Sequence, residues 1–239
     1  MSRLLLVRHA QASFLAANYD QLSAHGETQA RLLGQYWAQR KIHFNRIACG
    51  PAVRHQQTAN LAAEAYRSSG LAFSAPTVLN DFDEFQGDAV MAQCLPQLCA
   101  TDSRFREMRD ALQSSTTDAE KHANFQRLFQ AVIALWVDHK IAVPGVESWQ
   151  DFANRAQRGL TNFLAQSEKG ELSVIFTSGG PIAIAVQRAL HLSTPDTLQI
   201  AWMARNCSLT EFLFSGDRFT LSTFNSFPHL DDEALLTYR

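Results

Sequence analysis

Short apolar runs that alternate with longer helical patterns are the feature that most constrains the fold of this 239-residue chain. The clearest runs cover residues 3–7, 46–49 and 172–177. Each is continuous rather than alternating in polarity, which is typical of a strand buried on both faces of a sheet. Weaker strand patterns lie at 77–79, 207–214 and 218–224, and helical patterns lie at 26–40, 51–68, 147–167 and 182–191. Strands that alternate with helices predict an α/β fold, here a three-layer α/β/α sandwich with a mainly parallel central sheet.

The segment at about 88–140 differs from this pattern. It shows helical periodicity at 89–98, 103–112 and 119–138 and no convincing strand. We therefore expect a single domain over 1–239, with 88–140 as a helical cap insertion that covers one edge of the sheet.

Composition excludes several function classes. Lys and Arg number 21 against 23 Asp and Glu, a net charge of −2, whereas a general nucleic-acid binder usually carries a basic excess. The four cysteines show no CxxC spacing, so neither a disulfide framework nor a zinc site is expected, and unpaired thiols fit a reducing compartment. The N-terminal apolar run is too short for a signal peptide or a membrane span. We expect a cytoplasmic protein without membrane partners, and the oligomeric state stays open.

Polar side chains follow the predicted strands at the edge where α/β sheets bind ligands. Arg8 and His9 follow the first strand, Arg54 lies one helical turn after the second, and Ser178 and Gly179 follow the strand at 172–177. Guanidinium groups suit phosphate oxygens, and a helix N-terminus after a Gly-Gly turn offers backbone N–H groups to an anion. These features predict an anion site.

This site also holds acid–base chemistry. Arginines beside an imidazole disfavour its charged form, so His9 is expected to stay neutral and act as a nucleophile. A protonated carboxyl group from Asp81, Asp83 or Glu84 can supply a proton to a leaving alkoxide.

The motifs resemble those of the histidine phosphatase superfamily, which has the phosphoglycerate mutase-like fold. The resemblance runs through nearly the whole chain and is carried by LLLVRHAQAS at 4–13, LSAHGETQA at 22–30, CGPAVRHQQTA at 49–59, LND at 79–81, GVESWQDFANR at 145–155, SVIFTSGG at 173–180, NCSLT at 206–210 and FNSFPHL at 224–230. It implies a phosphomonoester hydrolase that needs no metal or other cofactor and acts on a small phosphorylated substrate or a similar anion. It is least specific over 88–140, which together with the loop 11–22 is expected to set specificity.

The resemblance also implies a role for each matching residue. His9 is the nucleophile that carries a phosphohistidine, and Arg8 and Arg54 bind the transferring phosphoryl group. Asp81 stands where the family has a glutamate as proton donor, and its shorter side chain leaves Asp83 and Glu84 as alternatives. Ser178 stands where the family has a second histidine, and Gly179 lies beside the phosphate.

Serine in place of that second histidine replaces a charge-assisted hydrogen bond by a neutral one, a loss on the order of 1 kcal/mol. Three other histidines were considered as substitutes: His25, His55 and His229. We expect none of them to replace the second histidine. The side chain of His55 is expected to point about 100° away from that of Arg54 on their common helix, His25 stands at a position that the family leaves variable, and His229 is better interpreted as structural.

Three alternatives remain open. The chain can be a weakened or inactive member that binds a phosphate ligand without turnover, which Ser178 favours. It can transfer phosphate as a mutase does. Less favoured is a serine hydrolase that uses Ser178, Asp217 and His229, because residue 176 is Phe where the motif G-x-S-x-G has glycine.

Overall fold

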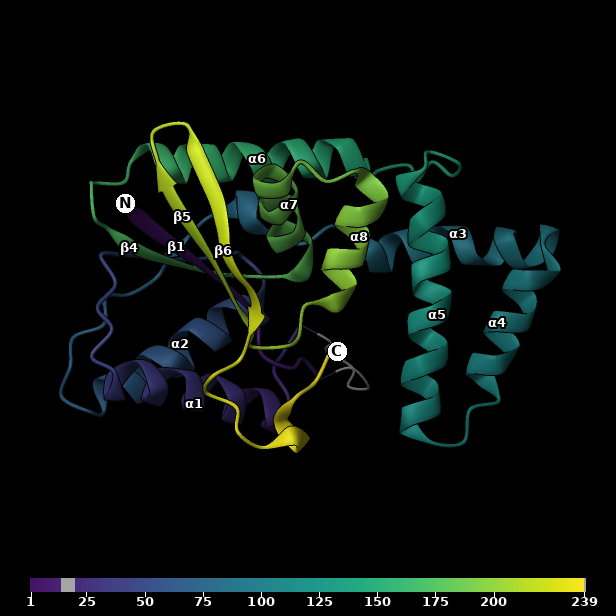
Figure 1. Ribbon diagram of the computed structural model, residues 1–239. Coiled ribbons are helices and arrows are strands. Elements are labelled where there is room, and N and C mark those ends of the chain that lie inside the picture. The colour runs from purple at the N-terminus through teal and green to yellow at the C-terminus, as the bar shows by residue number, and fades with distance from the viewer. Residues whose placement is uncertain (14–19, 239) are drawn as a thin grey trace. The chain divides into compact units, whose positions relative to one another are not determined.

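The computed structural model describes residues 1–13 and 20–238, and its centre is a six-stranded sheet in the order β3-β2-β4-β1-β5-β6 (Figure 1). The strands are β1 (Ser2–Arg8), β2 (Arg46–Cys49), β3 (Thr77–Val78), β4 (Leu172–Thr177), β5 (Leu209–Ser215) and β6 (Arg218–Ser226). The first four strands run parallel to one another, and β5 and β6 are antiparallel to their neighbours. The predicted mainly parallel sheet is confirmed.

Helices cover both faces of this sheet (Figure 1). On one face, α1 (Ala24–Gln39) and α2 (Val53–Arg67) pack Leu33, Trp37 and Tyr66 onto apolar side chains of β2 and β4. On the other face, α6 (Trp149–Ala165) and α7 (Gly179–Leu190) pack onto β1, β4 and β5. Strands buried by helices on both sides explain why their sequences are continuously apolar.

The chain divides into two compact units, of which the first holds the sheet and comprises residues 1–84 and 154–239. The second comprises 85–153 and is helical, with α3 (Gly87–Thr101), α4 (Ser103–Gln113) and α5 (Asp118–Val137). Its core holds Phe85 stacked on Trp136 at 5.6 Å between ring centroids. The α6 helix begins in the second unit and ends in the first.

Two helical features differ from the sequence prediction. The α7 helix begins at Gly179 rather than at 182, directly after β4. An additional helix, α8 (Thr194–Met203), was not predicted, although the Ser193 side chain caps its N-terminus and a proline lies in its first turn.

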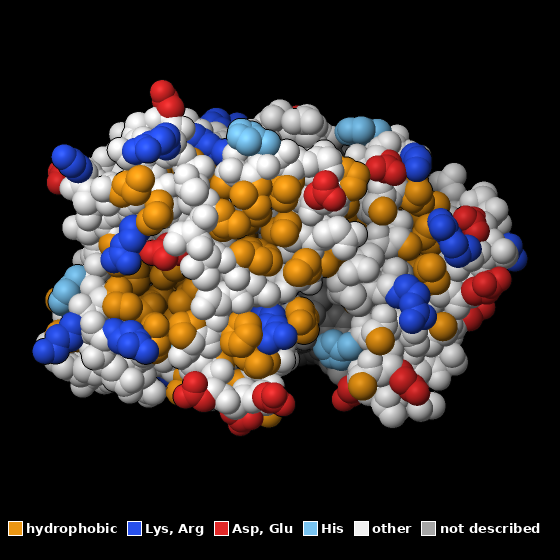
Figure 2. Space-filling view, in the orientation of Figure 1, with side chains coloured by type: hydrophobic (Ala, Val, Ile, Leu, Met, Phe, Trp, Pro, Cys, Tyr) orange, Lys and Arg blue, Asp and Glu red, His pale blue; other side chains and the backbone are white. Residues whose placement is uncertain are grey.

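The surface is of mixed charge, and Figure 2 shows acidic and basic side chains interspersed over the visible face. All four cysteines are buried and unpaired. Among the described residues, no helix is long and apolar enough to cross a membrane.

Candidate active site

The ends of β1, β2 and β4 lie side by side and bring the predicted residues together. Arg8 pairs in register with Thr177, and the His9 backbone N–H donates to the Thr177 carbonyl at 2.7 Å. The Gly50 N–H, after β2, donates to the Phe176 carbonyl at 2.8 Å. The side chains that follow these three strands therefore share one edge of the sheet, as the sequence predicted.

The His9 imidazole is held in one tautomer. Its Nδ1 lies 2.8 Å from the Ala10 carbonyl oxygen, which can only accept, so Nδ1 carries the proton and Nε2 presents a lone pair. Burial, the charges of Arg54 and Arg8, and the neighbouring His55 hold the pKa of His9 well below its usual range. The ring is therefore neutral at pH 7, with Nε2 free of hydrogen bonds from the described residues, and is suited to nucleophilic attack.

Hydrogen bonds to its backbone and to that of Ala10 hold His9 in place. The His9 carbonyl accepts from the Cys207 N–H at 3.1 Å and from the Asn206 side chain at 3.3 Å. The Ala10 N–H donates to the Thr58 hydroxyl at 3.0 Å, and that hydroxyl donates to the Arg54 carbonyl at 2.7 Å. Thr58 and Asn206 were not predicted as site residues, although both lie within motifs that carry the family resemblance.

Two arginines lie at the site as predicted. Arg8 is buried and donates through Nη1 to the Ala204 carbonyl. Arg54, in the first turn of α2, donates through Nη1 to Asp20 Oδ1 at 2.7 Å and through Nη2 to Ser178 Oγ at 3.5 Å. Asp20 also accepts from the Val53 N–H at 3.0 Å, so this carboxylate caps α2 and orients the guanidinium. Asp20 was not predicted individually, although it belongs to the loop 11–22 that was expected to set specificity; residues 14–19 of that loop lie outside the described residues.

His55 lies in the site, contrary to the sequence prediction. Its Nε2 is 2.6 Å from Ser178 Oγ, and its ring centroid is 5.7 Å from that of His9. The two side chains leave α2 in different directions, yet both reach Ser178 Oγ, because α2 begins beside the site and Arg54 and His55 lie in its first turn. Burial, followed by the charge of Arg54, holds the pKa of His55 well below its usual range.

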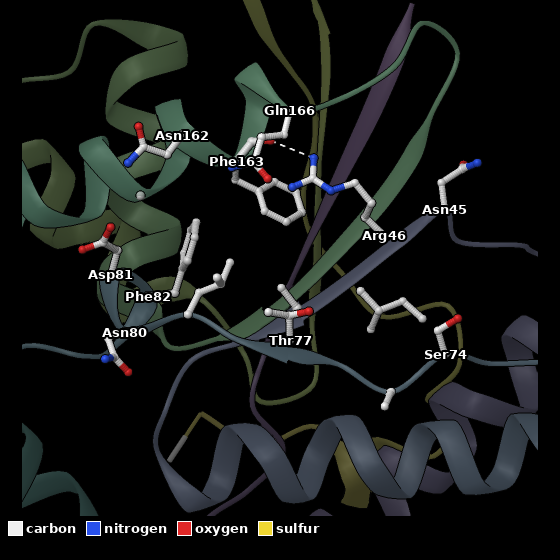
Figure 3. Close-up of a pocket in the computed structure, with 15 residues that line it drawn as sticks. Asn45, Arg46, Ser74, Thr77, Asn80, Asp81, Phe82, Asn162, Phe163 and Gln166 are labelled. Carbon is white, nitrogen blue, oxygen red and sulfur yellow. Dashed lines mark hydrogen bonds between the residues drawn. The ribbon is translucent and has the colours of Figure 1, made fainter.

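Asp81 contacts α6 instead of the other predicted residues. Its Oδ1 accepts from Arg158 Nη2 at 2.8 Å, and Gly159 leaves room for it. Asp81 also lines a separate pocket of about 530 Å³ formed by residues near β2, β3 and α6 (Figure 3). Arg155 donates to the carbonyls of residues 80, 81 and 83. These hydrogen bonds hold the turn so that the Asp81 carboxylate faces α6.

The two alternative acids lie nearer the predicted residues. Glu84 Oε2 accepts from the Gly180 N–H at 3.0 Å, two residues from Ser178. Asp83 interacts electrostatically with Arg54, and burial raises its pKa. Asp83 Oδ1 also accepts from the Glu84 N–H at 2.9 Å. The Gly180 N–H is therefore occupied by the Glu84 side chain, whereas the sequence predicted that this helix N-terminus would offer its N–H groups to a bound ligand.

The serine hydrolase triad is not assembled, which corrects that alternative. His229 is buried against Tyr36, at 6.2 Å between ring centroids, and both of its ring nitrogens lack hydrogen-bond partners among the described residues. Asp217 lies in the turn between β5 and β6, beside a pocket lined by residues 1 and 2. The imidazole beside Ser178 is that of His55.

Among the described residues, no group of three or more His, Cys, Asp or Glu side chains is placed to hold a metal ion. The positive charge at the site comes from Arg8 and Arg54. The geometry thus combines a neutral imidazole, two guanidinium groups and nearby carboxyl groups, which is a set suited to binding and transferring a phosphoryl group.

Solved structures share this fold at low sequence identity. A mycobacterial glucosyl-3-phosphoglycerate phosphatase, in complex with VO3, is 21% identical with a TM-score of 0.61, covering 94% of this chain and 98% of that one. The α-ribazole phosphatase of Shigella flexneri is 20% identical with a TM-score of 0.60, covering 94% and 96%. A phosphoglycerate mutase of Bacillus anthracis is 17% identical with a TM-score of 0.63, covering 95% and 94%. No curated protein matches the chain.

A sequence model of the histidine phosphatase superfamily (branch 1) matches residues 4–88 and 89–226. This match covers most of the chain and includes Arg8, His9, Arg54 and Ser178, which the structure brings together at one edge of the sheet. The protein belongs to the histidine phosphatase superfamily.

Proposed function

We propose that the protein is a metal-independent phosphomonoester hydrolase that forms a phosphohistidine on His9. The observation that carries the proposal is the protonation of His9: its Nδ1 proton is held by the Ala10 carbonyl, while burial and the charges of Arg54 and Arg8 keep the ring neutral. A neutral imidazole with a directed lone pair next to two phosphate-binding cations is the arrangement that nucleophilic attack on phosphorus requires.

In the first step, Arg8 and Arg54 bind the phosphoryl oxygens, and His9 Nε2 attacks phosphorus as the bond to the leaving oxygen breaks. The leaving alkoxide takes a proton from a carboxylic acid. In the second step, the carboxylate left by the first step takes a proton from a water molecule as that water attacks phosphorus. The P–N bond breaks, inorganic phosphate is released, and the neutral ring and the carboxylic acid are both restored. The arginines neutralise the charge that develops on the phosphoryl oxygens.

We assign the proton donor to Glu84 rather than to Asp81. Glu84 lies at the N-terminus of α7 next to Ser178, where its Oε1 can carry the proton while Oε2 accepts from the Gly180 N–H, whereas Asp81 forms an ion pair with Arg158. Asp83 is the alternative proton donor, because burial raises its pKa, as a proton donor requires. Its Oδ1, however, accepts from the Glu84 N–H.

The substrate class is a small phosphomonoester. The similar structures include enzymes named for glucosyl-3-phosphoglycerate and α-ribazole phosphate, so both compounds belong in a test panel with p-nitrophenyl phosphate.

Inorganic phosphate release is measured for wild type, His9→Ala and His229→Ala, the last being a control that removes a buried imidazole outside the site. The proposal predicts turnover by wild type and His229→Ala but not by His9→Ala. Equal rates for wild type and His9→Ala would overturn it.

A second candidate is a family member that binds a phosphorylated ligand without hydrolysing it. Ser178 at the position of the second histidine supports this candidate, as does the carboxylate of Asp20 on Arg54. It predicts that a phosphorylated ligand raises the melting temperature while no member of the panel is hydrolysed. A mutase is distinguished by transfer of phosphate between phosphoglycerates in place of its release.

A further inference from the structure

The Ser178 hydroxyl is surrounded by hydrogen-bond donors. Arg54 Nη2 donates to Oγ at 3.5 Å, and His55 Nε2 lies 2.6 Å from the same atom. Ser178 is the N-cap residue of α7, yet its side chain caps no backbone N–H of that helix. Both side chains of the Ser178–His55 pair are buried, at 1% and 0% exposure. The hydroxyl is therefore committed to α2 rather than to its own helix.

The tautomer of His55 follows from its other nitrogen. His55 Nδ1 is buried and has no hydrogen-bond partner among the described residues. An orphaned buried N–H is rarer and costlier than an orphaned acceptor, so the proton belongs on Nε2 and points at Ser178 Oγ. A serine oxygen has two acceptor sites, which the N–H groups of His55 and Arg54 then fill. The Ser178 hydroxyl hydrogen is thus left to point at a further acceptor.

We propose that His55 is a positioning residue that holds the Ser178 hydroxyl so that it donates to a phosphoryl oxygen bound by Arg54. This inference rests on the proposed phosphoryl-transfer function. An imidazole from α2 and a serine from the end of β4 together take the place in which the family resemblance expects one histidine at 178.

Two steric observations support this pairing. A side-chain carbon on Gly50 would lie 2.4 Å from His55 Nδ1, so the absence of one at residue 50 makes room for the ring. With His55 Nε2 at 2.6 Å from Ser178 Oγ, the space beside residue 178 is already filled by an imidazole. Ser178→His alone would therefore clash, and it becomes compatible with the site only when combined with His55→Ala.

The test measures binding of orthovanadate, a phosphate-like anion, by calorimetry, with melting temperature as the check of folding. We expect His55→Ala and Ser178→Ala each to weaken vanadate binding about tenfold. Because the two residues act through one hydroxyl, the double variant should be no weaker than either single variant. His55→Ala/Ser178→His should recover most of the affinity, while His229→Ala, the matched loss of a buried imidazole, should bind vanadate as wild type does.

Vanadate affinity equal to wild type in His55→Ala, or losses in the two single variants that multiply in the double variant, would overturn the inference. If His55→Ala does not fold, His55→Asn replaces it, because its shorter amide cannot reach Ser178 and the same loss is expected. Phosphate release is assayed alongside with His9→Ala as blank. Failure of turnover in wild type would refute the proposed hydrolase, whereas vanadate binding tests His55 independently.

Discussion

Replacing Gly50 by alanine should displace the His55 imidazole and release Ser178. The added carbon would lie 2.4 Å from His55 Nδ1 and 2.6 Å from the Phe82 carbonyl oxygen, whereas ordinary contacts begin at 3.4 Å. The ring must therefore move by about 1 Å, and a shift of that size disrupts the geometry of its 2.6 Å contact with Ser178 Oγ.

The cost in stability follows from overpacking a buried site. Such insertions typically cost about 1–3 kcal/mol, and in a chain of this size about 2 kcal/mol lowers the melting temperature by about 4–8 °C. The substitution should also weaken vanadate binding about as much as His55→Ala does.

A double-mutant cycle separates the clash with the ring from the clash with the backbone. In the His55→Ala background the clash with the ring is gone while the contact with the Phe82 carbonyl remains, so Gly50→Ala should lower the melting temperature less than in wild type. Thermal melts of the four proteins measure this. An equal decrease in both backgrounds, or unchanged vanadate affinity in Gly50→Ala, would refute the reasoning.

Two further predictions concern the acid and pH. Glu84→Gln should slow hydrolysis of an alkyl phosphate at least tenfold but barely affect hydrolysis of p-nitrophenyl phosphate, because the p-nitrophenolate leaving group needs no proton. Asp81→Asn should show no such difference between the two substrates. If Asp83→Asn shows the difference and Glu84→Gln does not, the proton donor is Asp83. Burial lowers the pKa of His229 to about 4, below its unfolded value of about 6.5, so its contribution to stability is complete above pH 6.5 and is lost as the pH falls toward 4. Between pH 7 and 4.5, denaturant titrations of wild type should therefore lose about 2–3 kcal/mol more unfolding free energy than those of His229→Leu, and equal losses would contradict this.

The sequence predicted the mainly parallel sheet well, because buried parallel strands leave a continuous apolar pattern. The placement of Arg8, His9 and Ser178 at strand ends could be predicted by a simple rule, because the ends of these strands can be read from the sequence. The α8 helix was missed because its composition is largely apolar without a clear periodic stripe, and its Ser193 cap and Pro195 were the available signals.

The sequence could not predict how side chains turn at the ends of the elements. Helical periodicity gives the angle between Arg54 and His55 but not where the end of α2 lies, and that position brings both to Ser178. Similarly, three carboxyl groups lie within six residues of the end of β3, and only the 3₁₀ turn at Asn80–Phe82, clamped by Arg155, decides which of them faces α6. Contacts distant in the sequence determine both outcomes.

Direct detection of a phosphoryl group on His9 is the measurement that tests the central claim. The wild-type protein is mixed with a phosphomonoester that it hydrolyses, quenched rapidly in base, in which phosphohistidine survives, and mapped by peptide mass spectrometry. We expect phosphate on His9 in wild type and no labelled peptide in His9→Ala. Phosphate on Ser178, or turnover that persists in His9→Ala, would contradict it.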